Sequence, residues 1–80
     1  MKIAADEKEL GKKISRHLKA EMKRSGVTYS ELAKRMKEQH GLEETEASVT
    51  SKLARGTFAA TWLLATLAAL ELEGVRLEDL

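Results

Sequence analysis

The chain has 80 residues, of which 42% are hydrophobic and only three are aromatic, and it contains neither cysteine nor proline. This length allows one small domain, and the lack of cysteine excludes disulfides and thiolate metal sites. Ten Lys or Arg stand against four Glu in residues 8–40, although the net charge of the whole chain is only +1. The basic half suits contact with phosphates, while the near-neutral total excludes a general polyanion binder.

The N-terminal residues carry acids where a signal peptide has an apolar core, and no apolar run reaches the roughly 20 residues of a membrane span. We therefore expect a cytoplasmic protein without a membrane partner. Strong helix formers dominate the sequence, which favours an all-α fold.

The first predicted helix spans residues 9–25, after a short charged tail at residues 1–8. Along it runs an apolar stripe with a four-residue period, formed by Leu10, Ile14, Leu18 and Met22. A basic stripe lies beside the apolar one and consists of Lys12, Arg16, Lys19 and Lys23. Such a stripe is either a solvated face or a surface for phosphates, and the sequence leaves both open.

Two shorter helices are predicted next, each with a polar N-cap. Thr28 and Glu31 fit a capping box, and the helix that they start ends before Gly41. After a linker at residues 42–44, Thr45 is the expected N-cap of a third helix over residues 46–55.

The fourth predicted helix, residues 58–70, has almost no polar side chain. A helix that is apolar all round is buried all round. It is therefore either a central core helix or a core helix whose second face forms a homodimer interface. Together the elements predict a compact bundle of about four helices in a single domain over residues 9–80.

The sequence shows no pattern typical of an enzyme. It has neither a nucleophile elbow nor a glycine-rich phosphate loop. The two histidines, His17 and His40, are far apart and lack a metal-binding motif. We therefore expect no catalytic residue, no cofactor, no metal and no small-molecule substrate.

The third predicted helix meets the requirements for a helix that lies in a DNA major groove. Its expected buried anchors, Val49 and Leu53, leave the opposite face free for short hydroxyls and two cations. Such groups reach base edges and phosphates, and the N-terminus of the preceding helix suits a phosphate. The candidate DNA-binding residues are Thr28, Tyr29, Ala47, Ser48, Ser51, Lys52 and Arg55.

At these residues the chain resembles a known family. Residues 28–56, with Glu-Leu-Ala at 31–33 and Leu-x-Arg-Gly at 53–56, are similar to the Cro/C1-type, λ-repressor-like helix-turn-helix proteins. Residues 62–70 resemble the fourth helix of that family. More closely, residues 18–33 and 51–58 resemble a small bacterial family of unassigned function within the same fold. The resemblance implies a bacterial transcription regulator, often a homodimer, that binds double-stranded DNA with residues 46–55 as the recognition helix.

An acidic, lengthened connection leaves a second function open. Residues 36–40 extend the second helix by about a turn beyond the family's pattern, and acids follow at Glu43, Glu44 and Glu46. Each acid would repel a nearby phosphate by on the order of 1 kcal/mol. The alternative is that the same fold serves as a protein–protein interaction module without DNA binding.

Overall fold

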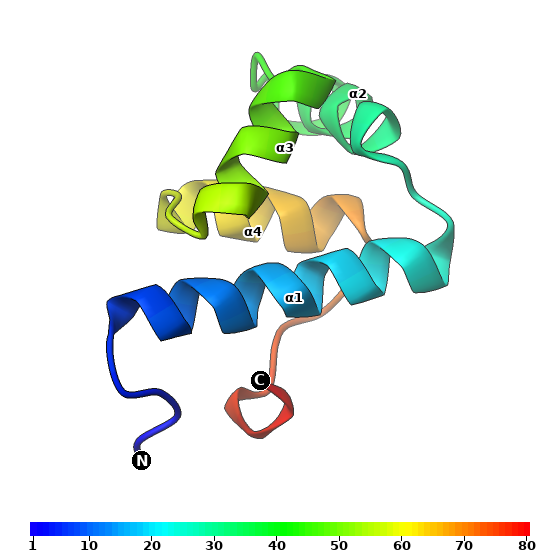
Figure 1. Ribbon diagram of the computed structural model, residues 1–80. Coiled ribbons are helices and arrows are strands. Elements are labelled where there is room, and N and C mark those ends of the chain that lie inside the picture. The colour runs from blue at the N-terminus through cyan, green and yellow to red at the C-terminus, as the bar shows by residue number, and fades with distance from the viewer.

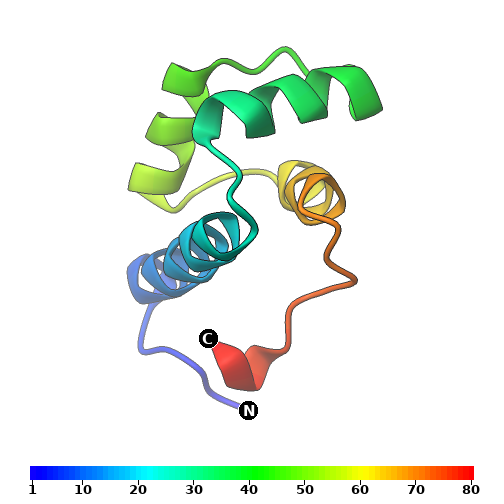
Figure 2. The same cartoon turned by 90° about the vertical axis from the view of Figure 1, so that its right-hand side faces the viewer.

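Four helices and no strand make up the computed structural model, which describes all 80 residues. The all-helical prediction is thus confirmed. The elements in chain order are α1 (Glu7–Ser25), α2 (Tyr29–His40), α3 (Glu46–Arg55), α4 (Ala60–Ala69) and a short 3-10 helix, η1 (Leu77–Asp79). The helices α2 and α3 lie over α1 and α4, and the C-terminal segment passes on the other side of α1 and α4 (Figures 1 and 2).

Local signals set the ends of the first three helices. The side chains of Asp6, Thr28 and Thr45 each accept a hydrogen bond from the backbone N–H three residues on. The three helices end at Gly26, Gly41 and Gly56, which all have positive φ. These ends agree with the sequence-based prediction, except that α1 starts two residues earlier because Asp6 caps it.

The capping box is found at α3, although the sequence pointed to α2. At α2, Thr28 accepts from the Glu31 N–H, but the Glu31 carboxylate pairs with Arg35 instead of returning to the cap. At α3, Thr45 and Ser48 each accept a hydrogen bond from the other's backbone N–H. A serine at the third helical position therefore closes the reciprocal pair at α3.

The core lies where α2 meets α3 and α4. The helix α2 packs against both of these helices, and α1 packs against α3. The largest fully buried side chains are Leu18, Leu32, Met36, Leu53, Val49 and Thr66. Val49 and Leu53 are the predicted anchors of α3, so the opposite face of that helix is turned toward solvent.

The helix α4 is buried on one side only, which corrects the expectation of burial all round. Trp62 and Ala69 are buried, whereas Leu64 is 65% exposed. The helix begins at Ala60, two residues later than predicted, and its N-cap residue Ala59 provides no side-chain hydrogen bond. An apolar stripe of α4 thus remains open, consisting of Thr61, Leu64 and Ala68. No helix has the length and apolar character that crossing a membrane requires.

Candidate nucleic-acid interface

The outward face of α3 is a shallow surface of small side chains with one carboxylate, that of Glu46, at its N-terminal end. Three predicted contact residues, Ala47, Ser51 and Arg55, are exposed on it. Two further small residues, Thr50 and Ala54, share the surface and were not among the candidates. Their place follows from the helical period counted from Val49 and Leu53, so the sequence already held the signal.

Two other candidates on α3 are held by a network inside the protein. The Lys52 ammonium lies 2.6 Å from the Glu44 carboxylate and 5.6 Å from the centre of the Trp62 ring. The Ser48 hydroxyl donates to the same carboxylate at 2.8 Å. These contacts fasten the α2–α3 connection to α3. The polar groups of Ser48 and Lys52 are therefore already partnered without DNA.

The carboxylate of Glu44 is stabilised in its ionised form by this network. Its side chain is only 8% exposed. Burial alone would raise the pKa of Glu44, but hydrogen bonds from Lys52 and Ser48 and the charge of Lys52 outweigh burial and lower it. The buried indole N–H of Trp62 acts in the same direction, although it does not reach hydrogen-bond geometry. One of the three acids near α3 is therefore neutralised by a lysine.

A basic junction forms where the C-terminal end of α3 meets the first half of α1. A cavity of about 280 Å³ lies there and is lined by four cations and no acid. The cations, here called the basic junction, are Lys12, Arg16, Lys19 and Arg55. Ser15 lines the same cavity, and its buried hydroxyl has no hydrogen-bond partner. The sequence showed the stripe on α1, but not that the fold would bring Arg55 to it.

Close backbone contact between Gly11 and Gly56 holds the basic junction together. A Cβ built on Gly11 would lie 2.5 Å from the Gly56 carbonyl oxygen, closer than real Cβ contacts allow. Gly11 stands near the start of α1. In the fold it allows α1 to touch the C-cap of α3, which sets the distance between the basic stripe and Arg55.

The remaining two candidates stand at the start of α2. Thr28 is exposed and caps that helix, while Tyr29 is partly buried against the core. No group of three or more His, Cys, Asp or Glu side chains is arranged to hold a metal ion. Three of the seven candidates thus share the open face of α3, two belong to the Glu44 network and two belong to α2.

The family described as "Domain of unknown function (DUF6471)" matches residues 10–75, from the first half of α1 to the segment after α4. The chain belongs to this family. No curated protein and no solved structure matches the chain.

All parts of the basic junction lie within the DUF6471 match. Gly11 and Lys12 stand near its start, and Arg55 and Gly56 lie in its second half. The DUF6471 domain therefore includes both the open face of α3 and the cations beside it. Residues 1–9 and residues 76–80, which include η1, lie outside the match.

Proposed function

We propose that the protein binds double-stranded DNA, with α2 and α3 acting as a λ-repressor-like helix-turn-helix and α3 lying in the major groove. The observation that carries this proposal is the acid-free basic junction at the end of an open, small-residue helix face. Phosphate contacts fix the position of a protein on DNA, and base contacts specify the sequence. The two kinds of surface lie side by side here.

The basic junction suits the DNA backbone. Lys12, Arg16 and Lys19 line one cavity with Arg55, so a phosphate there meets several cations at once. This anchoring places the C-terminal end of α3 against the backbone, with its open face toward the groove.

The open face suits close approach to base edges. Ala47 and Ala54 present methyl groups, which favour the methyl group of thymine, and Ser51 presents a hydroxyl. Long amide side chains that read adenine bidentately are missing from α3. We therefore expect modest sequence discrimination.

The other candidates have separate roles in this proposal. Thr28 and Tyr29 offer the N-terminus of α2 to a second phosphate. Ser48 and Lys52 position the α2–α3 connection through Glu44. Since Glu44 is paired with Lys52, its repulsion of DNA is smaller than its charge suggests.

A transcription regulator of this kind acts as a homodimer in a bacterial cytoplasm, as the resemblance to the Cro/C1-type proteins implies. The exposed stripe of α4 offers the apolar contact for a second copy, with Leu64 at its centre. A two-fold pair would then present its two α3 helices one turn of DNA apart, about 34 Å.

The experiment that tests DNA binding is a salt titration with labelled random and genomic duplexes, read by fluorescence anisotropy. The variant pair Arg16→Gln with Arg55→Gln removes two cations of the basic junction. We expect its slope of log affinity against log salt to fall by about two for each bound protomer, and so by about four for a homodimer, because each lost phosphate contact removes about one unit. Ala47→Val with Ser51→Val should instead change the preferred sequence and leave the slope intact.

A matched control uses Lys23→Gln with Arg24→Gln, which removes the same charge from the other end of α1. This control should keep the wild-type slope. Equal losses from the two double variants would mean that only net charge matters, and the proposed site would be wrong. No binding to any duplex at about 50 mM salt would refute DNA binding altogether.

A second candidate function rests on the open stripe of α4. A shallow apolar hollow of about 430 Å³ lies there, lined by Leu42, Leu64, Ala68 and their neighbours. This surface favours a protein–protein interaction module. If this is the function, Leu64→Glu should abolish binding of the partner protein, whether or not the chain binds DNA. A DNA-binding protein would need the basic junction in addition.

A further inference from the structure

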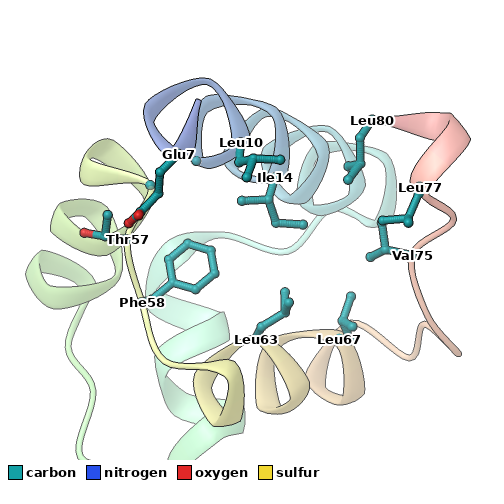
Figure 3. A pocket seen from close by; sticks show the side chains of 12 residues that line it. Glu7, Leu10, Ile14, Thr57, Phe58, Leu63, Leu67, Val75, Leu77 and Leu80 are labelled. Atoms are coloured by element: carbon teal, nitrogen blue, oxygen red, sulfur yellow. The ribbon is translucent and has the colours of Figure 1, made fainter. Parts of the chain in front are cut away.

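A second, larger cavity shares Gly11 and Gly56 with the cavity of the basic junction. It occupies about 520 Å³ between the first half of α1, the segment after α3, the inner side of α4 and the C-terminal segment. Figure 2 shows α1 and α4 nearly end-on, with the C-terminal segment as the third side. In Figure 3, Glu7 and Thr57 lie at one end of the cavity, while Leu77 and Leu80 lie at the other.

The walls of this cavity are mainly aliphatic and aromatic. Leu10 and Ile14 face Leu63 and Leu67 across it, with Phe58 to one side (Figure 3). Leu10 is 42% exposed, so the protein's own side chains leave the space unfilled. Both volume and apolar character match small-molecule sites, which span about 300–1,000 Å³.

One charged side chain lines the cavity, that of Glu7. It takes part in none of the salt bridges of the protein. The first turn of a helix already favours an acid, so the charge alone does not define a site. Together, the carboxylate of Glu7 and the apolar walls favour a ligand in which a cationic group is attached to an apolar body.

A helical segment fits the cavity poorly, because a helix with its side chains is about 10–12 Å wide and the C-terminal segment closes one side of the cavity. Such a helical segment would have to displace η1 and the residues before it.

We propose that this cavity binds a small amphipathic amine, with its apolar body between α1 and α4 and its ammonium beside Glu7. The site is separate from the open face of α3, and the proposal does not depend on DNA binding. The segment from Gly56 to Phe58 belongs to the cavity wall and directly follows α3.

Three probes of equal chain length test the proposal: n-octylamine, n-octanol and octanoate, each titrated into the isotopically labelled 80-residue chain and followed by amide NMR. We expect shifts confined to the first half of α1, residues 56–58, the inner side of α4 and residues 75–80. Octylamine should bind about fivefold tighter than octanol, from one charge pair near water, and octanoate should bind weakest.

Glu7→Gln should remove the preference for the amine and leave octanol affinity unchanged. Leu10→Trp fills the mouth of the cavity and should weaken all three probes at least tenfold. Leu64→Trp makes the same change on the open stripe of α4 and should leave their binding as it is. All three positions are exposed, so each variant should fold, which thermal unfolding checks.

Other outcomes would overturn the proposal. Equal affinity for the three probes, or a preference for octylamine that survives Glu7→Gln, would show a non-specific apolar surface. Shifts centred on Leu64 would place the binding elsewhere. Sedimentation that shows a dimer with residues 75–80 protected from hydrogen exchange in the absence of a probe would make the cavity an interface between copies.

Discussion

Glu44 and Lys52 lie eight positions apart in the sequence and form a salt bridge in the folded chain. The pair lies partly beneath the surface, with 8% and 28% of the side chains exposed. Ser48 and the ring of Trp62 complete the surroundings. A lysine that looks free on a helical wheel is therefore a structural residue that fixes the start of α3.

The substitution Glu44→Gln should cost about 1–3 kcal/mol of unfolding free energy at pH 7, because a charge-assisted pair is lost. The pKa of Glu44 is lowered in the folded state, so its stabilisation is complete above the unfolded value of about 4.3. It is lost as the pH falls through the folded pKa. The difference in unfolding free energy between wild type and variant should therefore become smaller as the pH is lowered. Urea unfolding at a series of pH values measures this difference.

Glu43→Gln is the matched control. This neighbouring side chain is 83% exposed and lies 3.9 Å from Lys37, so its removal should change the stability little at any pH. If the difference in unfolding free energy between wild type and Glu44→Gln is the same at pH 7 and at pH 3, the charge of Glu44 does not contribute to stability.

At the scale of elements, local signals explain what the sequence could predict. The caps at Thr28 and Thr45 and the glycines at 26, 41 and 56 act within one turn, so the ends of α2 and α3 followed from them. The fourth helix lacks such signals at its start, and there the predicted boundary was wrong by two residues.

Contacts between helices could not be predicted in the same way. The meeting of Gly11 with Gly56, and of Arg55 with the basic stripe, depends on how α1 crosses α3. No pattern in the sequence encodes that crossing. Likewise, the half of α4 that stays open depends on where its neighbours end.

The contact between α1 and α3 gives a prediction at this scale. Gly11→Ala should lower the unfolding free energy by about 1–3 kcal/mol despite the better helix propensity of alanine, because the obstructing atoms belong to the backbone. Gly74→Ala is the control, since nothing lies within 4 Å of its added Cβ. Thermal unfolding followed by circular dichroism measures both, and an unchanged or raised stability of Gly11→Ala would contradict the close contact.

At the scale of the molecule, the proposed homodimer sets a condition on where the α3 helices lie. The Cα trace spans 36 × 22 × 20 Å, so two copies joined across the shortest axis, with side chains between them, have centres more than 20 Å apart. A separation of about 34 Å between the α3 helices then requires them to lie on outer sides of the pair. Only 16 of 80 residues are buried, which leaves scope for a partner to add stability.

The melting temperature should therefore rise with protein concentration, because association stabilises the folded state by mass action. Leu64→Glu, in the open stripe of α4, should remove this dependence and give a monomer in sedimentation experiments. Leu77→Glu changes another exposed leucine outside that stripe and should keep the dependence. If the melting temperature of the wild type is constant from micromolar to millimolar protein, the open stripe of α4 is not an interface between copies.

The contact of Gly11 with Gly56 also restricts how this fold can vary among related sequences. Position 56 is fixed twice, by its φ of 70° and by the backbone of α1 beside it, whereas position 11 is fixed by space alone. We expect relatives that keep this crossing to carry glycine at both positions. A relative with a larger residue at position 11 must have moved α1 away from α3. The identity of that one residue would then show, from sequence alone, whether the basic stripe still reaches the end of α3.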